Sequence, residues 1–172
     1  DVSMPHLVIT GASAGIGAAT AELFQNNGFD IVNLSRKPCP VAGVTNIRCD
    51  LSESDFIQTI QDDLYIALGD SAQITLIHNA ALLINDNIAS TDSEQLRRVL
   101  EINVVAASSL NQILIPRMGT GSSVLYVGST LGEKAVPNSF TYATSKHAVI
   151  GMMRATCQDL AGSGVHTVCI NP

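Results

Sequence analysis

The chain has 172 residues and a net charge of −6, with 46% apolar and only 14% charged residues. This length and composition predict one folded domain with a substantial core and exclude a disordered chain. The negative charge argues against nucleic acid as a partner, because no basic patch is available for a phosphate backbone. No apolar run is long enough to cross a bilayer and no charged leader precedes the first apolar run, so we expect a cytoplasmic protein without membrane contact.

Cysteine usage predicts neither a disulfide framework nor a metal site. The four cysteines are scattered, form no C-x-x-C pair, and have no histidine at ligand spacing: Cys39, Cys49, Cys157 and Cys169. We therefore expect reduced, mostly buried thiols. Residues 1–3, ahead of Met4, are interpreted as an expression remnant, and residues 1–172 otherwise as a single domain.

Short aliphatic runs alternate with longer helical patterns along the chain. Six buried strands are predicted, at residues 7–10, 30–34, 46–49, 74–78, 123–127 and 166–170. Helical patterns lie between them, over residues 15–27, 52–68, 92–118 and 138–161. The connection 35–45 is short and rich in Pro and Gly, so a crossover helix there is not expected. This alternation predicts a doubly wound α/β fold, a parallel sheet covered by helices on both faces.

Ligands of such a sheet bind beyond the carboxyl ends of the strands, and a glycine-rich segment, TGASAGIG, follows the first strand. Gly11 permits a tight turn, Gly15 lets the backbone approach a pyrophosphate, and Gly17 allows close packing of helix on strand. The helix N-terminus adds free N–H groups. We expect a dinucleotide here rather than a merely tight turn, bound by Gly11, Ser13, Ala14, Gly15, Ile16 and Gly17.

The end of the second strand predicts which cofactor is bound. Asp30 lies at the wrong end of that strand, whereas Ser35, Arg36 and Lys37 lie at the crevice end. An Arg accommodates the 2′-phosphate of NADP, while a carboxylate would bind the ribose hydroxyl of NAD. These residues predict NADP(H) in preference to NAD(H); an ordinary solvated loop is the alternative.

Two further segments follow strands. Asp50, after the third strand, can accept a hydrogen bond from an adenine amino group with Leu51 packed beside it, or it can cap a helix. The segment HNAA follows the fourth strand, and its small residues let the backbone of Asn79 and Ala80 pass close to a ligand.

The segment TYATSKHAVIG places Tyr142 and Lys146 on one face of a helix. In isolation such a pair is usually surface decoration. A phenol with a pKa of about 10 exchanges protons near neutrality only if its anion is stabilised, and a cation one helical turn away can do this.

Together these motifs resemble those of the short-chain dehydrogenase/reductase family, over the whole chain. The family's T-G-x-x-x-G-x-G is residues 10–17, and its N-N-A-G is HNAA, with His78 and Ala81 in place of Asn and Gly. Its helix asparagine corresponds to Asn103, its serine to Ser129, and its Y-x-x-x-K to Tyr142 and Lys146.

The resemblance implies a Rossmann-type, three-layer α/β/α domain and a hydride transfer between NADP(H) and a carbonyl or secondary alcohol, without a metal. Tyr142 would be the acid/base and Ser129 would polarise the substrate oxygen. Lys146 would tune Tyr142 and hold the nicotinamide ribose, and Asn103 would hold a water that relays protons. The rival interpretations are a module that senses NADP(H) without turnover and a sugar-nucleotide epimerase or dehydratase. The spacing of Gly11 and Gly15 disfavours the epimerase.

The resemblance also implies that Pro172 lies near the nicotinamide and that the family's C-terminal part, with its substrate lid, is missing here. It further implies a homodimer or homotetramer, assembled through the helical stretch 92–118 and the helix around Tyr142. The apolar residues expected at that contact are Val104, Val105, Ile113, Val149, Met152 and Met153.

Overall fold

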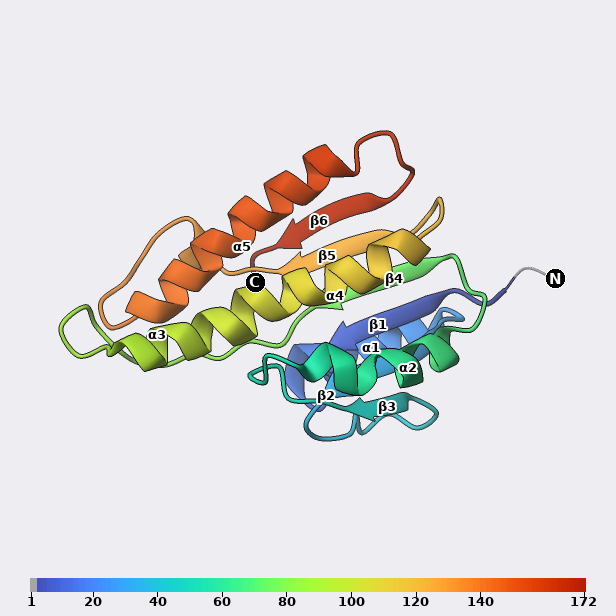
Figure 1. Ribbon diagram of the computed structural model, residues 1–172, viewed down its shortest axis with the longest axis horizontal. Helices are drawn as coiled ribbons and strands as arrows, with labels where there is room; N and C mark the ends of the chain where they lie inside the picture. Colours follow the sequence, from blue (N-terminus) through green and yellow to red (C-terminus); the bar gives the residue numbers. More distant parts are fainter. Residues whose placement is uncertain (1–2) are drawn as a thin grey trace.

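A computed structural model describes residues 3–172 and contains a six-stranded sheet in which all paired strands are parallel. The strand order is β3-β2-β1-β4-β5-β6 (Figure 1). The strands are β1 (His6–Thr10), β2 (Asp30–Ser35), β3 (Thr45–Arg48), β4 (Ile74–His78), β5 (Ser123–Val127) and β6 (His166–Ile170). All six predicted strands are confirmed. The order reverses between β1 and β4, which makes their carboxyl ends the expected ligand site.

The helices also follow the sequence prediction, with one interruption. The α-helices are α1 (Gly15–Asn26), α2 (Phe56–Leu68), α3 (Ser93–Leu100), α4 (Ala106–Leu114) and α5 (Phe140–Asp159). The shorter helical segments are the π-helix η1 (Glu101–Val105) and the 3-10 helices η2 (Ile115–Arg117) and η3 (Thr130–Gly132). No helix lies between β2 and β3 in the described chain, as predicted.

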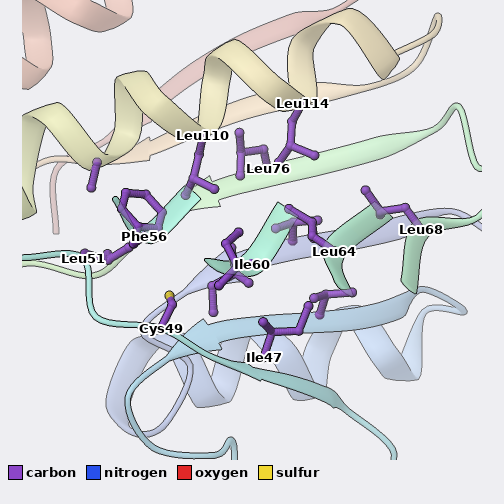
Figure 2. Packing of buried hydrophobic residues seen from close by; sticks show 14 of the residues in the cluster. Ile47, Cys49, Leu51, Phe56, Ile60, Leu64, Leu68, Leu76, Leu110 and Leu114 are labelled. Carbon is purple, nitrogen blue, oxygen red and sulfur yellow. The ribbon is translucent and has the colours of Figure 1, made fainter. Parts of the chain in front are cut away.

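Helices α2, α4 and α5 pack on one face of the sheet, and α1 packs on the other (Figure 1). Helix α2 carries Phe56, Ile60, Leu64 and Leu68 at every fourth position, so all four side chains share one buried face. Figure 2 shows these residues in one cluster with the leucines of α4. Burying each such side chain contributes about 1.5 to 3 kcal/mol, so this cluster holds α2 and α4 on the sheet.

The two edge strands differ from the prediction of six buried strands. On β3 only Ile47 is buried, and on β6 every second residue is exposed, including Val168 at 42% and Ile170 at 43%. Both strands have a neighbour on one side only, and among the described residues a helix covers only one of their faces. An edge position thus exposes side chains that an apolar run predicts to be buried.

The helical stretch Ser93–Arg117 is long and apolar enough to cross a membrane, by length and composition alone. A core helix of a water-soluble protein passes the same test. Val99, Leu110 and Leu114 of this stretch are fully buried inside the protein. The expectation of no membrane contact stays a prediction.

Candidate functional site

The turn between β1 and α1 is held tightly against the end of β4. Gly11 has φ +73°, and a Cβ there would lie 3.0 Å from the Cα of Ala80. The Thr10 hydroxyl oxygen accepts hydrogen bonds from the backbone N–H groups of Asn79 and Ala80, each at 3.0 Å. A Cβ on Gly17 would collide with the carbonyl oxygen of Gly11. The predicted roles of Gly11 and Gly17 as a tight turn and a close contact are therefore visible in the geometry.

The first turn of α1 opens from this glycine turn. Its N-cap residue, Ala14, is extended, and no side chain caps the helix. Ala14, Gly15 and Ile16 are exposed, and Gly15 has φ +55°. Uncapped N–H groups with the positive end of the helix dipole are suited to a phosphate.

A cleft of about 460 Å³ begins at this turn and runs along the ends of β1, β2, β3 and β4. It brings together most of the predicted cofactor residues: Gly11, Ser13, Ser35, Arg36, Asp50, Leu51, Asn79 and Ala80. Lys37 and Arg98 also line it. Arg98 was missed by sequence reasoning, because α3 lies far along the chain from the glycine turn. The cleft thus carries three cationic side chains in a protein of net charge −6.

The side chain of Asp50 has a local partner as well as a place in the cleft. Its Oδ1 accepts hydrogen bonds from the Ser52 N–H at 2.9 Å and the Ser52 hydroxyl at 2.7 Å. These bonds hold the pKa of Asp50 below its ordinary value, and the nearby Arg36 and Arg98 guanidinium groups lower it further. These bonds close a local turn and do not cap α2, which begins at Phe56 with Asp55 as its N-cap, so the helix-capping alternative is wrong and Asp50 lines the cleft.

Asn33 of β2, which sequence reasoning did not single out, orders the loop that carries Arg36. Its Oδ1 accepts from the Ala12 N–H at 3.0 Å, and its Nδ2 donates to the Ser35 hydroxyl at 2.9 Å and to Asn46 Oδ1 at 3.0 Å. Asn33 is buried, unlike most asparagines. A polar residue inside an otherwise apolar strand was the only sequence signal for this role.

Asn79 performs a similar structural task. Its Nδ2 donates to the carbonyl oxygens of Thr10 and Gly11, both at 3.1 Å. The side-chain amide nitrogen of Asn79 therefore stabilises the glycine turn. Asn79 also lines the cleft, so its contact with a cofactor stays a prediction.

Tyr142 and Lys146 lie one turn apart on α5, as predicted. Lys146 Nζ is 5.4 Å from the centroid of the Tyr142 ring and donates to the Val127 carbonyl oxygen at 2.9 Å. Lys146 is only 4% exposed, and burial lowers its pKa, an effect that the neighbouring Cys169 opposes. Tyr142 is half-buried. The ammonium group is thus fixed beside the phenol by the end of β5.

Asn103 lies in the π-helix η1, where the long helix changes its hydrogen-bond pattern. Its Oδ1 accepts from the Leu82 N–H at 2.7 Å, and its Nδ2 donates to the Leu82 carbonyl and the Ser145 hydroxyl, each at 3.0 Å. Ser145 in turn donates to the Tyr142 carbonyl oxygen at 2.8 Å. Asn103 therefore connects the loop after β4 to the helix that carries Tyr142.

A small internal cavity of about 10 Å³ adjoins the cleft and is lined by Asn103 and Lys146, together with His78. Ser129 and Tyr142 line neither the cavity nor the cleft. The Ser129 hydroxyl oxygen accepts from the Leu131 N–H at 3.1 Å at the start of η3.

Pro172 is exposed at the end of the described chain. Within residues 3–172, no group of three or more His, Cys, Asp or Glu side chains could hold a metal ion.

Known proteins resemble this chain in sequence and in fold. The sequence profile described as short chain dehydrogenase matches residues 5–172. Short chain aldehyde dehydrogenase 1 of Euphorbia lathyris is 28% identical, over 96% of this chain and 62% of that protein. A short chain dehydrogenase family protein from Francisella tularensis has a TM-score of 0.88 at 27% identity, over 99% of this chain and 69% of that chain.

A second solved structure is an oxidoreductase from Brucella ovis in complex with a partially ordered NAD. It has a TM-score of 0.88 at 27% identity, over 99% of this chain and 83% of that chain. The profile match spans nearly all of the described residues, and the fold agrees with it. The chain therefore belongs to the short chain dehydrogenase family.

Proposed function

We propose that this protein is an NADP(H)-dependent oxidoreductase that interconverts a carbonyl compound and an alcohol. The observation that carries this proposal is the pair Tyr142 and Lys146, in which a buried ammonium group is fixed 5.4 Å from the phenol ring. A structural role alone gives no reason to bury a lysine, because its desolvation costs free energy. A cation beside a weak acid is the arrangement that proton transfer at neutral pH needs.

Each residue of the pair has a distinct task in this proposal. When bound, the nicotinamide cofactor supplies or accepts the hydride. Tyr142 donates a proton to the oxygen of the carbonyl as it is reduced, or removes one from the alcohol as it is oxidised. Lys146 stabilises the phenolate by its charge, and Ser129 donates a hydrogen bond to the substrate oxygen.

Asn103 receives a positioning task, because its amide is already hydrogen-bonded to Leu82 and Ser145. The cavity beside it has about the volume that one water molecule needs. We assign to this cavity the water that passes protons between Lys146 and solvent.

The preference for NADP rests on Arg36. Arg36, Lys37 and Arg98 line the cleft against a single carboxylate, Asp50, which supports binding of a ligand with an additional phosphate. A guanidinium can hold a phosphate with two charge-assisted hydrogen bonds. The Brucella ovis relative holds NAD, which supports a nicotinamide dinucleotide in this cleft without deciding between the two.

Calorimetric titration of NADPH and NADH tests this preference. The wild type should bind NADPH at least about tenfold more tightly, which corresponds to roughly 1.4 kcal/mol. The double variant Ser35→Asp, Arg36→Gln should shrink or reverse the preference, because its carboxylate repels the phosphate and accepts from the free ribose hydroxyl. Arg97→Gln is the matched control, since Arg97 is exposed and paired with Glu94 outside the cleft.

Equal wild-type affinities for the two cofactors would show that Arg36 is only a solvated loop residue. An equal effect of Arg97→Gln would show that the cleft responds to general charge and not to Arg36.

We further propose that the protein is cytoplasmic, that residues 4–172 form one domain, and that the substrate is a small carbonyl compound or alcohol. We also propose that the protein assembles as a homodimer or homotetramer. Val105 of η1 is 43% exposed, and Phe140 and Ile88 line an apolar hollow of about 550 Å³ beside α5. Both features support a contact through the long helical stretch and α5. Val149 is not available for this contact, because it is buried in the core of its own chain.

A further inference from the structure

Asp86 is a buried carboxylate that the proposed reaction does not use. It lies in the loop between β4 and α3 and is 4% exposed. Its backbone forms a parallel bridge with Ser139, in which the Asp86 N–H donates to the Asn138 carbonyl at 3.1 Å and the Phe140 N–H donates to the Asp86 carbonyl at 3.2 Å. This loop and the start of α5 therefore lie together at one end of the molecule (Figure 1).

The Asp86 side chain is bound on both oxygens. Oδ1 accepts from the Thr141 N–H at 3.1 Å, and Oδ2 accepts from the Thr141 hydroxyl at 2.7 Å and from Gln95 Nε2 at 2.9 Å. Burial alone would raise the pKa of Asp86, but the bonds from Thr141 and Gln95 outweigh it and lower the pKa below its ordinary value. The site is therefore built for a charged carboxylate.

Helix α5 has no side-chain cap from its own N-cap residue, and the Asp86 carboxylate takes that place. Ser139 occupies the N-cap position but makes no capping hydrogen bond, since its hydroxyl donates to the Val136 carbonyl at 2.7 Å. The preceding residue, Asn138, has φ +61°, a left-handed conformation that asparagine adopts more readily than most residues. Asp86 satisfies the Thr141 N–H in the first turn and places a negative charge at the positive end of the helix dipole.

Tyr142 follows Thr141 in that same first turn. Fraying at a helix end moves the first residues most, and a displacement of about 1 Å at a reacting group can lower the rate about 100-fold. We propose that Asp86 is a positioning residue, which holds Tyr142 in its reactive place by capping α5 through Thr141. This inference rests on the proposed function for its catalytic consequence.

The test compares Asp86→Ala, Asp86→Asn and Thr141→Val with the control Asp92→Ala. Asp92 is the local N-cap of the neighbouring helix α3, with its Oδ1 accepting from the Gln95 N–H at 2.7 Å, so this control loses a helix cap and keeps the bonds between Asp86 and Thr141. The reaction is reduction of para-nitrobenzaldehyde by NADPH, with the full-length protein. Amide hydrogen exchange over residues 140–145 is measured in parallel on the same variants.

Asp86→Ala should lower kcat by roughly 10- to 100-fold while KM and NADPH affinity change little, because Asp86 itself does not line the cleft. Asp86→Asn should restore only part of the rate, since its carbonyl oxygen can still accept from the Thr141 N–H but its amide nitrogen cannot accept from Gln95 and the negative charge is lost. Thr141→Val removes one hydrogen bond at nearly constant volume and should give an intermediate kcat. Asp92→Ala should lose the cap of α3 and keep kcat.

Hydrogen exchange decides the inference independently of catalysis. In Asp86→Ala, residues 140–145 should exchange roughly tenfold faster or more, and in Asp92→Ala they should exchange as in the wild type. Unchanged exchange in Asp86→Ala overturns the inference, and so does equal loss of kcat in Asp86→Ala and Asp92→Ala. If Asp86→Ala does not fold, Thr141→Val gives the same two readouts. A wild type that reduces no carbonyl compound contradicts the proposed function instead, and exchange still decides whether Asp86 caps α5.

Discussion

His78 should make the stability of this protein depend on pH in a way that one substitution removes. It ends a chain of buried hydrogen bonds in which the Thr156 hydroxyl donates to Met152, Tyr126 donates to Thr156, and Asn111 Nδ2 donates to Tyr126. This order leaves Asn111 Oδ1 to accept from His78 Nε2 at 2.7 Å. Burial lowers the pKa of His78 to about 4, opposed by the bond to Asn111, so the imidazole is neutral at pH 7.

The sign and size of the effect follow from the two protonation states. As the pH falls below 6.5, the ordinary pKa, the unfolded chain takes up a proton at His78 and the folded chain does not until about pH 4. His78 therefore leaves the free energy of unfolding unchanged above about pH 6.5 and lowers it as the pH falls toward 4. Between pH 7 and pH 5 the loss from this group is about 2 kcal/mol, from linkage with about 1.4 kcal/mol per pKa unit.

Urea unfolding followed by far-UV circular dichroism at pH 7 and pH 5 measures this loss. The variant His78→Asn carries the residue that the family's N-N-A-G element has at this position. Its free energy of unfolding should fall by about 2 kcal/mol less than that of the wild type over this pH range. His166→Gln, at an exposed position on β6, should behave as the wild type. The same pH dependence in His78→Asn and the wild type would refute the assignment of a neutral, buried His78.

Three other outcomes follow from the structure. Lys146→Ala should lower both turnover and cofactor affinity, because one ammonium group has two tasks; loss of affinity with an unchanged pH profile of turnover would contradict its role beside Tyr142. Gly17→Ala should cost about 1 to 3 kcal/mol in chemical denaturation, since its Cβ would lie 2.6 Å from Asn79 Nδ2, whereas Gly151→Ala, with open space around it, should cost nothing. Light scattering at micromolar concentration should give at least a dimer for the full-length protein, and a monomer would contradict the proposed assembly.

Much of the fold could be predicted because its signals are local. Aliphatic runs such as ITLIH specify buried strands, and the four-residue spacing from Phe56 to Leu68 specifies one buried face of α2. The glycine turn was equally predictable, because only glycine fits a positive φ at Gly11 and a close carbonyl contact at Gly17.

What the sequence did not predict depends on long-range contacts. Asp86 accepts a hydrogen bond from Thr141, which is 55 residues away in the sequence, and no local sequence pattern predicts this contact. The π-helix around Asn103 leaves the apolar pattern of the long helix intact, so periodicity alone does not reveal it. Arg98 enters the cleft only because the fold brings α3 beside the ends of β2 and β3.

The most direct test of the proposed function is Tyr142→Phe, which removes one hydroxyl group and little volume. We expect this variant to bind NADPH within about threefold of the wild-type affinity and to lose roughly 100-fold or more of its rate of carbonyl reduction, because the proton donor is gone. Turnover in Tyr142→Phe at the wild-type rate would contradict the account. A wild type that binds NADPH but reduces no carbonyl compound would instead favour a sensor of NADP(H).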